Sequence, residues 1–125
     1  MCIDDKFINA VIQVESGGDD QAVGDKHLIN KAYGCLQIRQ PAVDDINRTC
    51  STRYKAQDCL GNRELAIWMF HQYAGIYATS RRLGRMVTNE DRARIWNAGP
   101  AGWKKDGSRR DALATMYWKK VQQFL

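Results

Sequence analysis

Apolar residues recur at helical spacing near the start of the chain. They are Ile3, Phe7, Ile8, Val11, Ile12 and Val14. This pattern predicts a helix over residues 4–15, with Asp4 or Asp5 as its N-cap. The sequence SGG at 16–18 predicts the end of the helix, because glycine readily takes the left-handed conformation that closes helices. Glu15 therefore lies in the last turn.

Polar residues and glycines dominate the next segment. Residues 19–38 lack a helical pattern and end in AYGCLQI, which favours a loop with short strands. Pro41 then predicts the start of a short helix, PAVDDINR, because proline is tolerated in the first turn.

Three helical patterns occupy the second half of the chain. The run RELAIWMFHQYAGIYA after Asn62 is apolar on almost every side, which predicts the buried central helix. Thr88 and Asp91 form a capping-box pattern that predicts a helix through Trp96, ended by NAGP. Ser108 is the expected N-cap of the last helix. Its core face is predicted to comprise Leu113, Met116, Tyr117, Val121 and Phe124.

These elements predict one domain over residues 1–125, since 125 residues suffice for a single core and no repeat or linker interrupts them. The expected fold class is α+β and mainly α-helical, with a small irregular β segment near residues 20–38. We expect a monomer.

The charge balance narrows the choice of partner. Nineteen Lys and Arg against fourteen Asp and Glu give a net charge of +5, which favours nucleic acid, acidic glycans or a membrane surface. The small basic groups, among them Arg92 with Arg94, are interpreted as solvated helix faces. No apolar run approaches the roughly 20 residues of a membrane span. The N-terminus lacks the pattern of a signal peptide.

The four cysteines, Cys2, Cys35, Cys50 and Cys59, permit three disulfide pairings. Cys50 and Cys59 bracket a polar loop, and a disulfide closing it would stabilise the fold by about 2 to 3 kcal/mol. We expect this pair, with Cys2 and Cys35 as a second candidate and four reduced thiols as the alternative. No CxxC occurs, so we expect no metal and no other cofactor.

Glu15 is the strongest candidate for chemistry. It continues the apolar stripe of the first helix and lies at the negative end of the helix dipole. Both effects disfavour the ionised carboxylate and predict a raised pKa, as a general acid requires. The alternative is that the side chain turns out into solvent or pairs with an arginine.

A second carboxylate would complete a glycosidase pair. Asp25 follows a glycine at a loop tip, where it can face a cleft and stay ionised, whereas Asp19 and Asp20 are typical turn residues. A turn role remains the alternative for Asp25.

Other mechanisms have less support. The sequence lacks a phosphate-binding glycine loop, and His27 and His71 lie far apart. Ser16 as a nucleophile with a lysine base is a weaker reading than Ser16 as a helix-end residue.

Three segments in order resemble a known family. ESGG at 15–18, AYGCLQI at 32–38 and RIWNAGPAGW at 94–103 are similar to the motifs of the soluble lytic transglycosylase and goose-type lysozyme superfamily. The segments ARIWNAGPAGWKK and MYWKKVQQF also resemble invertebrate-type, destabilase-like lysozymes. The resemblance implies a lysozyme-like fold and cleavage between N-acetylmuramic acid (MurNAc) and N-acetylglucosamine (GlcNAc) in peptidoglycan.

The resemblance also implies site residues. Glu15 would be the catalytic acid and Asp25 the second carboxylate. The expected substrate-binding residues are Ser16, Tyr33, Gln37, Trp96 and Asn97, with packing in the core as the alternative for Trp96.

From the resemblance we expect a peptidoglycan-cleaving muramidase that acts outside the cytoplasm. A lytic transglycosylase and a non-catalytic glycan-binding protein are the alternatives. Anionic peptidoglycan would also account for the basic surface, so we expect no nucleic-acid partner.

Overall fold

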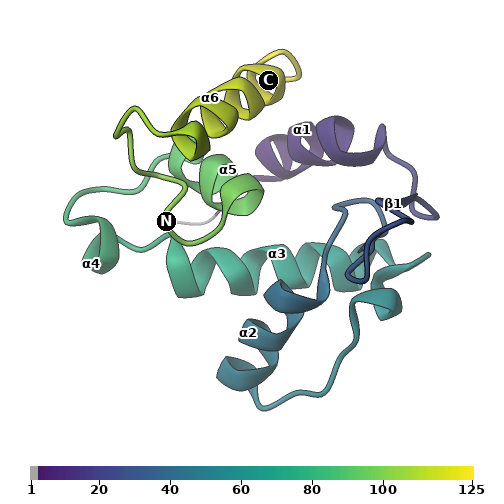
Figure 1. The fold of residues 1–125 in the computed structure, drawn as a ribbon. Helices are drawn as coiled ribbons and strands as arrows, with labels where there is room; N and C mark the ends of the chain where they lie inside the picture. The colour runs from purple at the N-terminus through teal and green to yellow at the C-terminus, as the bar shows by residue number, and fades with distance from the viewer. Residues whose placement is uncertain (1–2) are drawn as a thin grey trace.

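The computed structural model describes residues 3–125 and is built mainly from helices around a short hairpin (Figure 1). In chain order the elements are α1 (Asp5–Ser16), β1 (Val23–Gly24), β2 (Ala32–Tyr33), α2 (Gln40–Cys50), the 3-10 helix η1 (Ala56–Cys59), α3 (Arg63–Tyr77), α4 (Ser80–Leu83), α5 (Asn89–Ala98) and α6 (Arg109–Gln122). The mainly helical α+β class expected from the sequence is confirmed.

The helix ends follow the capping residues of the sequence. The Asp4 carboxylate accepts a hydrogen bond from the Phe7 amide at the start of α1, at 2.7 Å. Gly17 ends the helix with φ +65°. Thr88 and Asp91 form the predicted capping box of α5. These side chains satisfy backbone groups that would otherwise have no partner, which explains why local sequence located the ends so well.

The predicted β segment is a two-stranded antiparallel hairpin. Val23 pairs with Tyr33, and Gly24 pairs with Ala32. An additional bridge joins Tyr33 to Ile38 and turns the chain toward α2. Asp25 thus directly follows β1, and residues 34–39 lie between the hairpin and α2.

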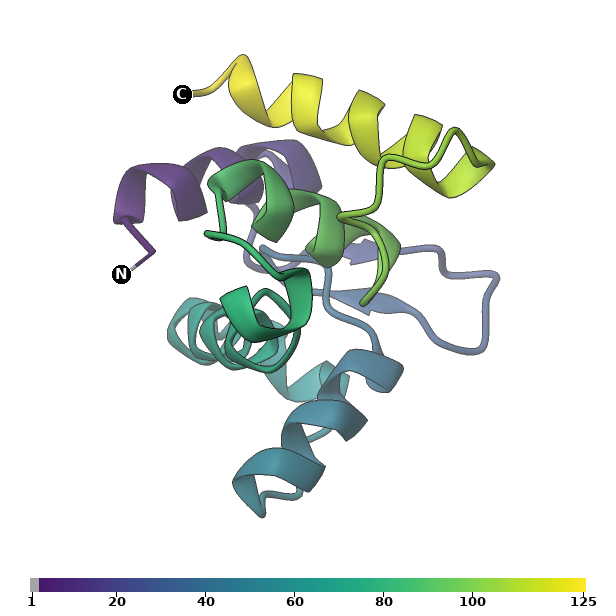
Figure 2. The same cartoon turned by 90° about the vertical axis from the view of Figure 1, so that its left-hand side faces the viewer.

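The elements form two groups around α3. The first group comprises α1, α5 and α6, and the second comprises α2 and the hairpin. In both ribbon views α6 lies over α1 and α5, while α2 and the hairpin lie away from α6 (Figures 1 and 2). Side chains from most elements share one core, which includes Phe7, Ile12, Leu36, Ile46, Met69, Phe70, Ile95 and Val121. The chain segments that meet between the two groups come from α1, the hairpin, α3 and α5.

The predicted core face of α6 is partly wrong. Tyr117 and Val121 are buried, but Leu113, Met116 and Phe124 are each at least half exposed. Helix α6 packs on α1 and α5 through a narrower stripe that also includes Ala114. Apolar periodicity overestimates burial where a helix covers the core from outside.

Arg94 departs from the expected solvated basic face. Its side chain is fully buried in α5. The guanidinium donates to Asp111 at 2.5 Å, to the Thr115 hydroxyl at 2.8 Å and to the Gly102 carbonyl at 3.0 Å. This arginine joins α5 to α6.

The expected disulfide between Cys50 and Cys59 is absent from the structure, where both are free thiols. The Cys50 thiol donates to the Gln72 side chain at 3.4 Å, and the Cys59 sulfur lies 3.5 Å from that of Met69. Each sulfur therefore faces α3 and not the other. Cys35 is a free buried thiol, and its suggested partner Cys2 lies outside the described residues.

Within residues 3–125, no helix has the length and apolar character that crossing a membrane requires.

Candidate active site

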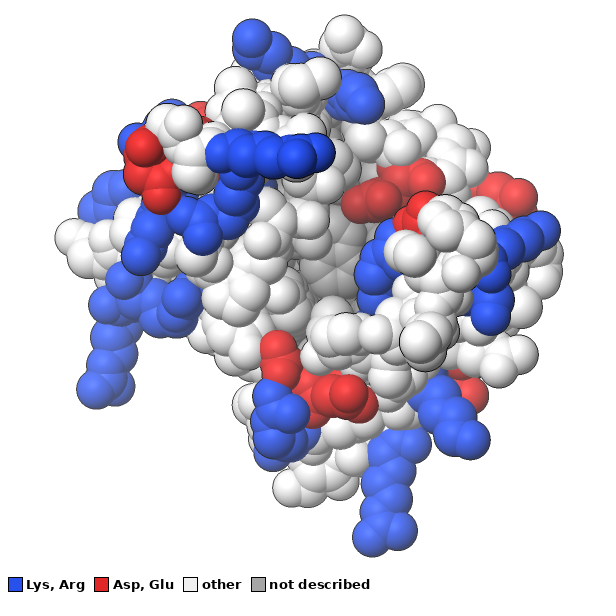
Figure 3. All heavy atoms as spheres, in the orientation of Figure 1, with Lys and Arg blue, Asp and Glu red and all other residues white. Residues whose placement is uncertain are grey.

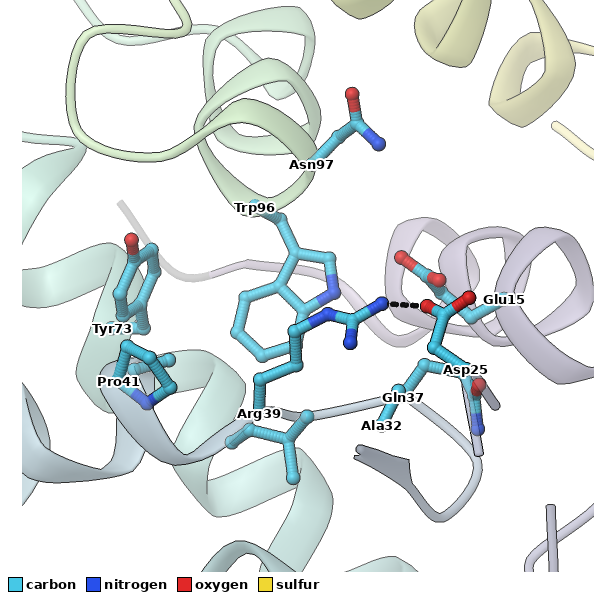
Figure 4. A pocket seen from close by; sticks show the side chains of 11 residues that line it. Glu15, Asp25, Ala32, Gln37, Arg39, Pro41, Tyr73, Trp96 and Asn97 are labelled. Atoms are coloured by element: carbon cyan, nitrogen blue, oxygen red, sulfur yellow. Dashed lines mark hydrogen bonds and ion pairs between the residues drawn. The ribbon is translucent and has the colours of Figure 1, made fainter. Parts of the chain in front are cut away.

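A pocket of about 310 Å³ lies between the two groups of elements. The face seen in Figure 3 is hollowed near its middle, with acidic atoms beside the hollow. Side chains from α1, the hairpin, the start of α2, α3 and α5 line the pocket (Figure 4): Glu15, Asp25, Ala32, Gln37, Ile38, Arg39, Pro41, Ala42, Tyr73, Trp96 and Asn97. Segments far apart in sequence thus contribute to one site.

Glu15 lies in the last turn of α1 and contributes its carboxyl to the pocket wall. Burial raises its pKa from 4.5 to about 7, against the opposing effects of a Tyr117 hydrogen bond, the charge of Arg39 and a Trp96 hydrogen bond. The direction is the one the sequence predicts, and desolvation is its main cause. Near neutral pH a large fraction of this carboxyl is protonated.

Tyr117 holds Glu15 from across the molecule. Its hydroxyl donates to Oε2 of Glu15 at 2.7 Å, which connects α6 to the end of α1. The tyrosine is only 7% exposed, and burial raises the pKa of its hydroxyl well above the usual value. A neutral tyrosine donor therefore holds one oxygen of Glu15, Oε2, in place.

Asp25 lines the same pocket in a different environment. It adopts a left-handed backbone conformation, with φ +51°, just after β1. Its carboxylate forms an ion pair with Arg39, drawn in Figure 4. The hydrogen bond and charge of Arg39 lower the pKa of Asp25. The pocket therefore contains one carboxyl with a raised pKa and one with a lowered pKa.

Gln37 forms part of the pocket lining next to the hairpin. Its amide nitrogen donates to the backbone carbonyls of Gly34 at 3.0 Å and Ala22 at 3.3 Å. Its Oε1 lies so close to Gly24 that a Cβ built on this glycine would be 2.1 Å away. Gly24 is therefore required for the position of Gln37.

Trp96 and Asn97 enter the pocket from the C-terminal half of α5. The Trp96 ring packs against Phe70 and Tyr73, with centroids 4.8 Å and 5.5 Å apart. Trp96 packs on the core and also lines the pocket. Its role in binding a sugar ring stays a prediction. Asn97 is exposed, and its amide points away from Trp96 (Figure 4).

Ser16 and Tyr33 lie outside this pocket lining. The Ser16 hydroxyl donates to the Cys35 carbonyl at 2.7 Å and accepts from the Gly18 amide at 3.2 Å. It attaches the end of α1 to the segment that follows β2. Tyr33 pairs within the hairpin through its backbone.

Sequence reasoning missed Arg39, Tyr73 and Tyr117 as site residues. Arg39 directly follows the segment AYGCLQI, so its position next to a candidate motif was a usable signal. The sequence places Tyr117 on the core face of α6, and its ring is buried there, but the helical pattern gives no information about the partner of its hydroxyl. No local pattern links it to Glu15, which is 102 residues away.

The pocket holds one carboxyl that can give up a proton near neutral pH and one that stays ionised there. Among residues 3–125, no three His, Cys, Asp or Glu side chains are grouped so as to hold a metal ion. A carboxylic acid and an ionised carboxylate in one pocket are the pair of groups used to cleave acetal bonds.

Similar folds occur in two solved lysozymes. An inhibitor-bound lysozyme from Meretrix lusoria superposes with a TM-score of 0.75 at 21% sequence identity, covering 97% of this chain and 89% of that one. Tapes japonica lysozyme gives a TM-score of 0.74 at 22% identity, covering 96% and 89%. These similarities establish a lysozyme-like fold. A search of curated protein sequences found no match.

The class defined by this fold and site is a lysozyme-like protein with a carboxylic acid at the end of its first helix. A family model, the Transglycosylase SLT domain, matches residues 2–118. The chain belongs to that family, as the three sequence motifs predicted. Membership places it in the expected enzyme class, lysozyme or lytic transglycosylase.

Proposed function

We propose that the protein is a muramidase that hydrolyses the β-1,4 bond between MurNAc and GlcNAc in peptidoglycan, outside the cytoplasm. The observation that carries the proposal is the pair of carboxyls in one pocket, with the pKa of Glu15 raised to about 7 and that of Asp25 lowered. Environments that separate two pKa values in this way distinguish an acid from an ionised partner.

Glu15 acts as the general acid in this mechanism. Tyr117 donates to Oε2, so in this mechanism the acidic proton is carried on the other carboxyl oxygen, Oε1. Transfer of that proton to the glycosidic oxygen lets the bond break through an oxocarbenium-like transition state. The GlcNAc alcohol leaves, and Glu15 becomes a carboxylate that can later accept a proton from water.

Asp25 stabilises the positive charge that develops on the muramyl ring. Its ion pair with Arg39 keeps it ionised at neutral pH. Water then adds to the anomeric carbon and gives a reducing MurNAc end. Gln37, Trp96 and Asn97 contribute polar and aromatic surface for the sugar rings.

One observation favours the alternative, a lytic transglycosylase. Asp25 is exposed, and Arg39 already neutralises much of its charge, which weakens its ability to stabilise a cation or activate water. If Asp25 does not participate, the 6-hydroxyl of the muramyl residue attacks the anomeric carbon and gives its proton to the Glu15 carboxylate. The product then has a 1,6-anhydro end.

Mass spectrometry of digested peptidoglycan distinguishes the two reactions. We expect reducing muropeptides as the main products, and Asp25→Asn should slow their release strongly without weakening wall binding. Anhydromuropeptides as the main products would establish the transglycosylase and overturn the hydrolase proposal.

A turbidity assay on bacterial cell walls tests the role of Glu15. The wild type should clear the suspension, and Glu15→Gln should not, since the amide cannot donate an acidic proton. Equal clearing by both proteins would exclude Glu15 as the acid. Binding of walls without clearing by either would favour a non-catalytic glycan-binding protein.

A further inference from the structure

A second cavity, of about 450 Å³, adjoins the candidate active site along α6. Asn97 lines both spaces, and Tyr117, which donates to Glu15, lines the second. We call it the α6 cavity; its lining comprises Asn97, Ala98, Arg110, Leu113, Met116, Tyr117 and Lys120. It therefore opens beside the proposed catalytic acid.

All charged residues that line the α6 cavity are basic. Arg110 and Lys120 line it, and its lining contains no Asp or Glu. Arg110 uses one terminal nitrogen to pair with Asp106 at 2.9 Å, and in the part of the chain that the structure describes its buried Nε has no hydrogen-bond partner. Within residues 3–125, Lys120 is exposed and forms no ion pair. The cavity can thus attract an anionic group.

The remaining wall of the cavity is aliphatic and open to solvent. Leu113 is 51% exposed and Met116 is 56% exposed. Successive helical turns place both on the same face of α6 as Lys120. These are residues that the sequence predicted to be in the core, and the structure leaves about half of each side chain open to solvent.

This combination does not suit a sugar ring. A neutral saccharide gains little from two cations and is usually held by aromatic faces and polar groups, as the first pocket provides. A short acidic peptide with small apolar side chains matches both the charge and the aliphatic wall. In peptidoglycan such a peptide branches from the lactyl group of each muramic acid residue and carries free carboxylates.

We propose that the α6 cavity binds the acidic stem peptide attached to the muramyl residue at the cleaved bond. This inference rests on the proposed function, because it places that residue beside Glu15. Arg110 and Lys120 contact the peptide carboxylates, while Leu113 and Met116 contact its aliphatic side chains. The enzyme therefore prefers glycan strands that retain their peptides.

The test compares two forms of one substrate. Peptidoglycan strands are used with their stem peptides and after an amidase has removed them, and kcat/KM is measured on both. The wild type should prefer the peptide-bearing strands. In Arg110→Gln/Lys120→Gln this preference should fall by roughly 3- to 10-fold, as expected for the loss of charge-assisted contacts. Arg109→Gln/Lys119→Gln removes the same charge from neighbouring α6 residues outside the lining and should retain the preference.

Two results would overturn the inference. One is an unchanged preference in the Arg110/Lys120 variant. The other is an equal loss on both substrates, which would indicate a sugar subsite or general attraction to the strand.

A second experiment does not depend on the proposed function. The free stem tripeptide is titrated into the protein, and NMR monitors its binding. Peptide binding should shift Leu113 and Met116 signals and weaken when the peptide carboxyls are amidated. If the wild type cleaves neither substrate, the proposed function fails, while this titration still supports or refutes the peptide site. Absence of binding, or equal binding of the amidated peptide, would refute it.

Discussion

At the scale of single residues, the chemistry depends on how the protein sets the protonation of Glu15. Burial raises its pKa, and three donors or charges oppose that effect. The sequence predicted the first contribution, because Glu15 extends an apolar stripe. It could not predict the opposing contacts from Tyr117 and Arg39, since these depend on how distant segments pack.

The Tyr117 hydrogen bond should be visible in the pH dependence of activity. It lowers the pKa of Glu15, so Tyr117→Phe should raise that pKa above about 7. Activity requires protonated Glu15 and falls as pH rises through this pKa, so the alkaline limb of kcat/KM should move to higher pH. Tyr54→Phe, which removes a more exposed phenol elsewhere, should leave the limb in place. An unmoved or acid-shifted limb in Tyr117→Phe would contradict the assigned contact.

The same carboxyl should couple folding stability to pH. The folded-state pKa of Glu15 is about 7, against an ordinary 4.5, so between these values the folded protein binds more protons than the unfolded chain. The free energy of unfolding therefore falls as pH rises from 4.5 through 7. Glu15→Gln keeps the shape without the charge and should be more stable than the wild type at pH 8 by about 1 to 3 kcal/mol.

Urea unfolding at pH 4 and pH 8 measures this coupling. The two proteins should have similar stability at pH 4, where Glu15 is protonated in both states of the wild type. A Glu15→Gln variant that is less stable than the wild type at pH 8 would show that the carboxylate is favourably held, contrary to a raised pKa.

Among the elements, the five long helices were predictable from the sequence, the hairpin only in outline, and the short helices α4 and η1 not at all. Caps such as Asp4 and Ser108 act within one turn, so local sequence locates the helix ends. The strands are two residues each, too short for an alternating pattern, and only their glycine-rich segment could be predicted. The exposed face of α6 was missed because periodicity does not reveal how much of a helix its neighbours cover.

Gly24 offers a test of how the hairpin positions the site. In Gly24→Ala the new methyl group would overlap Oε1 of Gln37, so that side chain must leave its bonds to Gly34 and Ala22. We expect a loss of about 1 to 2 kcal/mol in stability and a larger loss in activity, because the displaced amide enters the pocket. Gly75→Ala in α3 is the control, since its Cβ meets nothing within 4 Å. Equal activity of the two variants would remove Gln37 from the site.

For the molecule as a whole, the site forms because the two groups of elements around α3 each contribute side chains to one pocket. Asp25, Gln37 and Arg39 come from one side, whereas Trp96, Asn97 and Tyr117 come from α5 and α6. The sequence supplied three motifs but no distances between them. The prediction that Arg94 lies on a solvated helix face was also wrong, because the burial of an arginine depends on partners that the fold brings together.

Arg94 should therefore contribute more to stability than any exposed basic residue. Arg94→Met retains most of the buried volume but leaves Asp111 without its cation and three oxygen acceptors without a donor: the Gly102 carbonyl, the Lys104 carbonyl and the Thr115 hydroxyl. Removing one partner of a buried pair costs about 3 to 5 kcal/mol, which is much of the stability of a small domain.

Urea unfolding compares this variant with Arg92→Met, which makes the same substitution two residues earlier in α5. Among residues 3–125, the Arg92 side chain has one hydrogen bond, to Asn89 in its own helix, so its loss should cost less than about 1 kcal/mol. Because α5 and α6 carry Trp96 and Tyr117, Arg94→Met should also lose wall-clearing activity at a lower temperature, in step with its unfolding. Equal unfolding midpoints for the two variants would show that the buried network does not hold these helices together.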